Sequence, residues 1–167
     1  RQLIRYSGIP VLKIPALLRR VRRELLSQSA PIPPCAGMPE IIRELHDNQI
    51  VLAVITSNTP AAVEAFLAAN QLSDCFLSVD GGGTLFRKGK LIARCLEQHQ
   101  LVAAQTVYVG DEVRDIEAAR SAGVRPVAVS WGFNSRSALA AAEPEWLIDD
   151  PQMLRAIAQS HEESAGQ

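Results

Sequence analysis

Two kinds of hydrophobic pattern alternate along this 167-residue chain. Short runs of apolar, often β-branched residues predict strands, whereas longer stretches with apolar residues three and four positions apart predict helices. The predicted strands are 50–55, 76–79, 106–109, 126–131 and 146–148. The first is an almost uninterrupted apolar run, which is typical of a parallel strand covered on both faces. Strands alternating with helices imply βαβ units, so we expect a three-layer α/β fold with a Rossmann-like parallel sheet between helices.

Three prolines divide the sequence just after residue 30. They interrupt regular structure because proline lacks a backbone donor and restricts the residue before it. The predicted divisions are an N-terminal segment at 1–30, an α/β core at 31–160 and a polar, flexible tail at 161–167. Because the chain starts with Arg1 inside sequence that is already patterned, we expect a fragment or a processed form.

The N-terminal segment contains a basic amphipathic pattern at 15–28. Leucines and a valine recur there at helical spacing, and four arginines between Arg19 and Arg23 occupy the other positions. A helix of this kind either binds a membrane surface or an acidic partner, or packs on the core with its charged face in solvent. The second interpretation is favoured.

Composition narrows the functional classes. With 17 basic and 18 acidic residues the net charge is −1, so no long-range field steers the chain toward nucleic acid or an anionic membrane. Cys35, Cys75 and Cys95 show no C-x-x-C spacing and predict buried thiols in a reducing compartment, the cytoplasm. The three histidines are scattered, which predicts no zinc site. No apolar run approaches the roughly 20 residues that span a bilayer, and no signal peptide is visible.

The clearest chemical pattern follows the predicted strand 106–109. Gly110 ends the strand, Asp111 comes next and Asp115 lies one helical turn further on. The i to i+4 spacing points both carboxylates at one place, at the strand ends where ligands bind in open α/β sheets. Two hard oxygen donors suit Mg²⁺. The alternative is that both residues only cap and charge a helix start.

Two other predicted loops carry polar groups. Thr56, Ser57 and Asn58 follow the strand at 50–55 and precede a helix, so they offer either an anion site or ordinary capping groups. A basic cluster around Lys88 leads into another helix, where a lysine either neutralises a phosphate beside carboxylates or lies on a solvated loop.

Taken together, these segments resemble the haloacid dehalogenase-like hydrolase superfamily, in particular the branch of phosphoglycolate phosphatase-like enzymes. The resemblance is carried by 54–58, 86–88 and 109–115, and it extends from about residue 33 to 154. It implies that Thr56 and Lys88 are catalytic, that Thr56, Ser57, Asn58 and Lys88 bind a phosphorylated substrate, and that Asp111 and Asp115 bind Mg²⁺. Lys90 is the less favoured alternative to Lys88. The resemblance also implies that the helix at 15–28 is the remnant of a helical cap, and that the loop 131–135 belongs to this branch.

One expected motif of this superfamily has no counterpart here. A strand ending in D-x-D-G-T should supply the nucleophilic aspartate, whereas Asp80 stands alone in a glycine-rich turn. In the superfamily this strand lies between those at 50–56 and 106–109, so its absence would expose two apolar strand edges.

Three interpretations follow for the function. The favoured one is the greater part of a Mg²⁺-dependent phosphatase that acts on a small, phosphoglycolate-like phosphomonoester. The second is a non-catalytic domain that binds a metal ion or a phosphorylated ligand. The third is an interaction module that binds a protein partner or forms homo-oligomers through exposed sheet edges.

Overall fold

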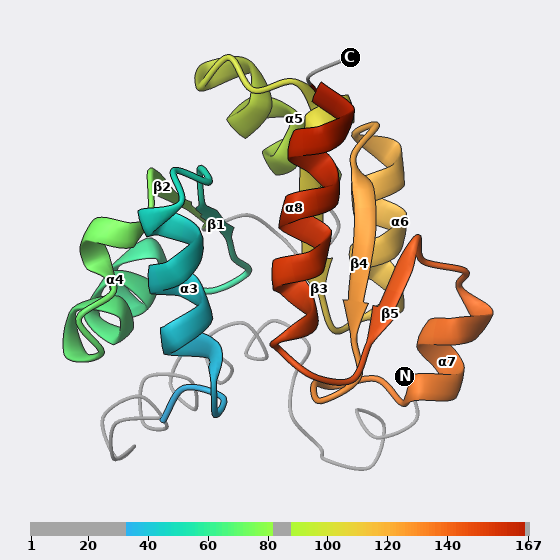
Figure 1. The fold of residues 1–167 in the computed structure, drawn as a ribbon, viewed down its shortest axis with the longest axis horizontal. Helices are drawn as coiled ribbons and strands as arrows, with labels where there is room; N and C mark the ends of the chain where they lie inside the picture. Colours follow the sequence, from blue (N-terminus) through green and yellow to red (C-terminus); the bar gives the residue numbers. More distant parts are fainter. Residues whose placement is uncertain (1–32, 82–87, 166–167) are drawn as a thin grey trace, which may run out of the picture. The chain divides into compact units, whose positions relative to one another are not determined.

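The computed structural model describes residues 33–81 and 88–165 (Figure 1). From Pro34 onward they belong to a compact unit, Pro34–Gln167, which is distinct from a unit at Arg1–Pro33. The predicted segment 1–30, with its cap helix at 15–28, lies outside the described residues. The account below concerns the second unit alone.

Five short strands form two parallel ladders. The strands are β1 (Ala53–Ile55), β2 (Ser78–Asp80), β3 (Val107–Gly110), β4 (Arg125–Val129) and β5 (Trp146–Ile148). β1 pairs with β2, and the second ladder has the order β3-β4-β5. The predicted parallel α/β architecture is confirmed, although the described strands form two hydrogen-bonded ladders rather than one sheet.

Helices connect the strands in the expected alternating order. They are α3 (Met38–Asp47), α4 (Pro60–Ala69), α5 (Lys88–Gln98), α6 (Val113–Ser121), α7 (Arg136–Ala141) and α8 (Met153–Ala165). Single 3-10 turns at Ser73–Cys75 and Ala103–Gln105 precede β2 and β3. α8 continues to Ala165, so residues 161–165 of the predicted flexible tail are helical.

The residues of β4 alternate between two helical layers (Figure 1). Val127 and Val129 pack in a cluster with residues of α3, α8 and β5, whereas Ala128 packs with residues of α6 and α7. Successive side chains of a strand point to opposite faces, so β4 is covered on both sides. This is the burial that the sequence analysis expected of the strand at 50–55.

The segment at 50–55 itself is less buried than its composition suggests. Only Ala53–Ile55 forms the strand, and Val51 is 56% exposed. Gln49 adopts a left-handed conformation, with φ of 64°, directly before Ile50, so the chain is still turning out of α3 at this point. The prediction of a strand buried on both faces is therefore wrong for residues 50–52.

Two further observations bear on the sequence predictions. Cys75 and Cys95 are buried free thiols as expected, but Cys35 is exposed. Within the described ranges, none of the helices has both the length and the apolar character that crossing a bilayer requires.

Candidate active site

Three carboxylates gather where β3 ends and α6 begins. Asp111 follows the last residue of β3, Glu112 is the N-cap of α6 and Asp115 lies in its first turn. One carboxylate oxygen from each lies within 4.8 Å of the others. The Asp115 side chain is only 3% exposed, so much of this negative charge is held away from water.

Lys88 provides a positive charge to the buried carboxylate. Its Nζ donates to Asp115 Oδ1 at 2.5 Å, and the Lys88 side chain is 15% exposed. Close packing of α5 on α6 brings Lys88 here, because a Cβ on Gly89 would lie 2.2 Å from Ser121 Oγ. Only glycine allows that approach without displacing Ser121. Lys88 and Asp115, which the family resemblance assigns to one site, are thus in direct contact.

Helix capping explains part of this arrangement and leaves the rest unexplained. The backbone N–H of Glu112 donates to Asp115 Oδ2 at 3.3 Å, as one half of a capping box. Asp115 Oδ1 is instead taken by Lys88, and Asp111 precedes the N-cap. Helix capping therefore accounts for the position of one Asp115 oxygen, Oδ2, and for neither the other Asp115 oxygen nor Asp111.

The loop after β4 fixes the orientation of Asp111. The backbone N–H of Phe133 donates to Asp111 Oδ2 at 2.7 Å, and the Asn134 N–H donates to the Asp111 carbonyl at 3.1 Å. Asn134 Oδ1 in turn accepts from the N–H of Val113, at 2.9 Å. A Cβ on Gly132 would lie 2.1 Å from that of Asp111, so glycine is required. The sequence analysis noted this loop only by resemblance and did not anticipate its contacts, because nothing local signals hydrogen bonds across 20 residues.

Carboxylates outnumber the cationic groups in this region, since Lys88 pairs with Asp115 and Arg114 with Glu112 while Asp111 has neither. Burial, followed by the charges of Asp115, Asp111 and Glu112, raises the pKa of Tyr108 well above its ordinary value. A hydrogen bond from Arg114 to Glu112 likewise raises the pKa of the guanidinium. Tyr108 therefore stays neutral at physiological pH, and the carboxylates attract a further cation.

The donor set fits a hard divalent ion. Asp111, Glu112 and Asp115 offer carboxylate oxygens, and Mg²⁺ uses one or two protein carboxylates together with water or phosphate oxygens. The hydrogen bond from Phe133 to Oδ2 leaves the other oxygen of Asp111 for such an ion.

The predicted phosphate loop lies at the end of β1. Thr56 Oγ1 accepts from the N–H of Asn58 at 2.9 Å, and the Thr56 N–H donates to the Asp80 carbonyl at 2.8 Å. A Cβ on Gly81 would lie 2.6 Å from Thr56 Cγ2, so the loop packs closely on the Gly81 backbone. Ser57 and Asn58 are exposed, and α4 begins at Pro60.

The contacts of the described residues gather Lys88, Asp111 and Asp115 into one cluster. The hydrogen bonds of Thr56 described above are made within its own loop and with Asp80. A site shared by Thr56 and the carboxylate cluster therefore stays a prediction.

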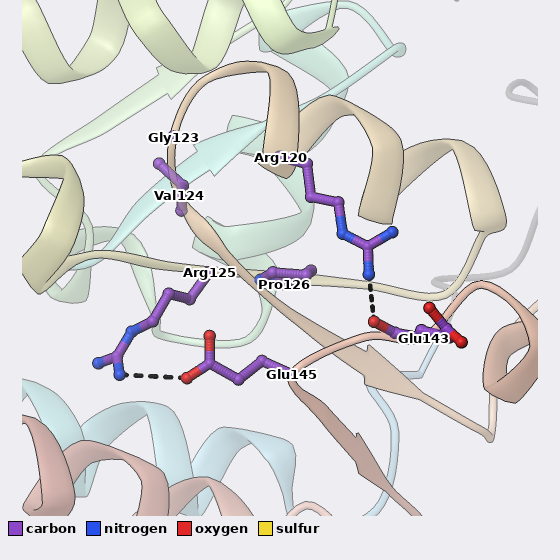
Figure 2. A pocket seen from close by; sticks show the side chains of 7 residues that line it. All are labelled: Arg120, Gly123, Val124, Arg125, Pro126, Glu143 and Glu145. Atoms are coloured by element: carbon purple, nitrogen blue, oxygen red, sulfur yellow. Dashed lines mark hydrogen bonds and ion pairs between the residues drawn. The ribbon is translucent and has the colours of Figure 1, made fainter.

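A hollow of about 350 Å³ lies elsewhere in the unit (Figure 2). It is lined by Arg120, Gly123, Val124, Arg125, Pro126, Glu143 and Glu145. Arg125 and Pro126 begin β4, so the hollow is at the amino ends of strands whose carboxyl ends lead to Asp111. Arg125 pairs with Glu145 at 3.2 Å and Arg120 donates to the backbone carbonyl of Glu143, so both guanidinium groups already have partners. The hollow is not the predicted site.

Comparison with known sequences relates this arrangement to a family. A family model described as haloacid dehalogenase-like hydrolase matches residues 1–129. The phosphoglycolate phosphatase of Synechococcus elongatus is 34% identical over 160 residues, which cover 95% of this chain and 76% of that protein. The phosphoglycolate phosphatase of Vibrio cholerae is 34% identical over 110 residues, 64% of this chain and 49% of that protein. The chain thus spans about half the length of several curated relatives that it matches.

Solved structures share the fold. A haloacid dehalogenase-like family hydrolase from Streptococcus pneumoniae has a TM-score of 0.73 at 18% identity, over 90% of this chain and 72% of that one. A predicted phosphoglycolate phosphatase from Haemophilus somnus has a TM-score of 0.67 at 27% identity, over 73% of this chain and 56% of that one. The α/β core described above is therefore that of a known group of structures.

Proposed function

Because this chain belongs to the haloacid dehalogenase-like hydrolase family, we propose that it is the greater part of a Mg²⁺-dependent phosphatase that acts on a small organic phosphomonoester. The observation that carries the proposal is the contact of Lys88 with the buried Asp115, beside the oriented carboxylate of Asp111. A purely structural ion pair does not require a second, nearby carboxylate that a separate loop holds in place.

Each side chain of the cluster has a distinct role in the proposal. Asp111 and Asp115 hold Mg²⁺, which when bound neutralises charge on the transferring phosphoryl oxygens. Lys88 bridges Asp115 and a phosphate oxygen, and its ammonium group stabilises the same charge. Thr56 donates its hydroxyl hydrogen to the phosphate. Ser57 and Asn58, with the N–H groups at the start of α4, complete the anion-binding loop.

The attacking carboxylate is proposed to come from a strand outside these 167 residues. Among the described strands, β1 pairs with β2 alone and β3 with β4 alone. Val109 in β3 is apolar yet 41% exposed, so one face of β3 is incompletely covered. These edges support the insertion of one parallel strand, and without it we expect homo-oligomers through the same edges. Asp80 accepts a hydrogen bond from Ser78 at 2.9 Å and keeps a structural role in this proposal.

The substrate is proposed to resemble phosphoglycolate. The names of the curated relatives support this class, since the proteins from Synechococcus elongatus and Vibrio cholerae are both phosphoglycolate phosphatases. We also propose a cytoplasmic location, supported by the three free thiols.

Turnover by two forms of the chain tests the proposal. The 167-residue chain and a form extended by its natural upstream segment are assayed for phosphate release from phosphoglycolate, with and without Mg²⁺. We expect Mg²⁺-dependent release by the extended form only, lost in Asp111→Asn and retained in Asp47→Asn, whose side chain is 79% exposed. Turnover that is insensitive to Asp111→Asn would contradict the proposal. Binding of Mg²⁺ and phosphate without turnover by the extended form would instead favour a non-catalytic domain.

A further inference from the structure

A second group of metal-ligating side chains lies outside the carboxylate cluster. It consists of Asp80 at the end of β2, Cys95 on α5, and His99, which directly follows the last residue of α5 and donates its N–H to the Cys95 carbonyl at 3.0 Å. One ligand atom of each lies within 4.8 Å of the others. The scattered histidines predicted no zinc site, but the i to i+4 spacing, continued by the hydrogen bond from His99 to Cys95, brings these two residues to the same side of the chain.

The surroundings of these residues leave one ligand atom without a partner. Cys95 is 6% exposed, and Asp80 and His99 are half-buried. His99 Nε2 is buried and has no hydrogen-bond partner among the described residues. Buried polar atoms are nearly always satisfied, so an orphaned nitrogen on an imidazole that lies beside a thiol and a carboxylate points to a missing ligand.

Ser78 supports the cluster from behind. Its hydroxyl donates to Asp80 Oδ2 at 2.9 Å and lies 4.0 Å from Cys95 Sγ. A hydrogen-bonded carboxylate of this kind is the usual partner that orients a metal ligand. The hydrogen bond from Ser78 therefore restrains the Asp80 side chain, so less side-chain entropy is lost when Asp80 binds a ligand.

We propose that Asp80, Cys95 and His99 bind a divalent transition-metal ion, Zn²⁺ in the first place. A thiolate, an imidazole and a carboxylate are the ligands that Zn²⁺ takes, whereas Mg²⁺ binds oxygen alone. In a tetrahedral zinc site, neighbouring ligand atoms lie about 3.3 to 3.8 Å apart, so the cluster needs to contract by about 1.5 Å at most on binding. Binding the thiolate releases the Cys95 proton to solvent, and water takes the fourth position.

A metal ion bound at this site would cross-link the end of β2 to α5. β2 and α5 are joined in sequence by the segment 81–87, and the bound ion links them a second time through side chains. Because the folded chain binds the ion at a preformed cluster, Zn²⁺ stabilises it. This inference is independent of the proposed phosphatase activity.

Cobalt spectroscopy tests the site directly. The chelator-treated, reduced chain is titrated with Co²⁺, and we expect one equivalent to give sulfur-to-cobalt charge-transfer absorption and the intense d–d bands of a tetrahedral site. Zn²⁺ displaces the signal, and excess Mg²⁺ does not. Cys95→Ser abolishes the charge-transfer band, whereas Cys35→Ser, Cys75→Ser and Asp111→Asn retain it. His99→Gln, checked for native circular dichroism, loses the tetrahedral d–d bands even if Cys95→Ser fails to fold.

Three results would overturn the proposal: no thiolate band at one equivalent of Co²⁺, an unchanged band in Cys95→Ser, or loss of the band in Cys35→Ser. The last would assign binding to the exposed thiol. Retention of the signal in Asp111→Asn separates this site from the carboxylate cluster, so the two proposals can fail independently.

Discussion

Replacing Lys88 by methionine leaves the charge of Asp115 buried without its cation. The Asp115 side chain is 3% exposed and Lys88 is 15% exposed, so water replaces the lysine poorly. Removing one partner of a buried pair costs about 3 to 5 kcal/mol. Asp115 keeps the hydrogen bond from the Glu112 N–H, so we take the lower limit and expect a loss of about 3 kcal/mol in the free energy of unfolding. For a chain of this length that corresponds to a fall in Tm of about 6 to 12 °C.

Urea and thermal unfolding, followed by circular dichroism at pH 7, measure the loss. Lys90→Met is the matched control, because Lys90 lies on the same helix and is exposed. The double variant Lys88→Met, Asp115→Asn has no unpaired buried charge, so we expect it to be more stable than Lys88→Met by about 2 kcal/mol. Equal unfolding midpoints for the Lys88 and Lys90 variants would refute the reasoning.

Three further predictions concern the loop, the acid stability and the core. Gly132→Ala places a Cβ 2.1 Å from that of Asp111, so it should displace the loop and weaken Mg²⁺ binding by at least about tenfold in calorimetry, with Tm changed little. A hydrogen bond from Arg155 lowers the pKa of Glu44 below 4.5, so their pair stabilises the fold above about pH 4.5 and loses this effect as pH falls through the lowered value. The urea midpoint of Glu44→Gln should accordingly be lower than that of the parent chain at pH 7, and the two midpoints should converge at low pH. Leu139→Ala, at a fully buried position, should cost about 3 kcal/mol in urea unfolding, and a cost below about 1 kcal/mol would contradict the packing described here.

The sequence predicted the elements of the α/β core well because their signals are local. The predicted strand at 146–148 coincides with β5, and the predicted strand at 106–109 overlaps β3. The predicted strand at 50–55 is longer than β1, because an apolar run does not show at which residues a neighbouring strand pairs with it. Val51 is apolar yet 56% exposed.

In the candidate site, too, the contacts within one segment were predictable from the sequence and those between distant segments were not. The spacing of Asp111 and Asp115 predicted their proximity, since both lie on one turn of chain. The contact of Lys88 with Asp115 depends on how α5 packs on α6, so only a family resemblance pointed to it. The hydrogen bond from Phe133 to Asp111 and the approach of Asp80 to Cys95 join distant segments, and no local pattern signals either.

The edges of β1 and β3 matter for activity, because the strand that carries the attacking carboxylate is proposed to pair there. Within the described part of the chain, β1 and β3 each have one strand neighbour. Ile55 of β1 and Tyr108 of β3 nevertheless pack against one hydrophobic cluster, built on Ile92 and Ala119. Side-chain packing therefore connects the two ladders, which share no hydrogen-bonded strand pair among the described residues.

Calorimetric titration of Mg²⁺ into the chain tests the central claim most directly, because it requires no turnover. We predict that Asp111→Asn raises the Kd for Mg²⁺ by at least about tenfold, or about 1.4 kcal/mol, whereas Asp47→Asn leaves it unchanged. Inorganic phosphate should tighten Mg²⁺ binding in the parent chain, and Lys88→Met should abolish that coupling. Equal Mg²⁺ affinities for the Asp111 and Asp47 variants would contradict the assignment of the carboxylate cluster as a metal site.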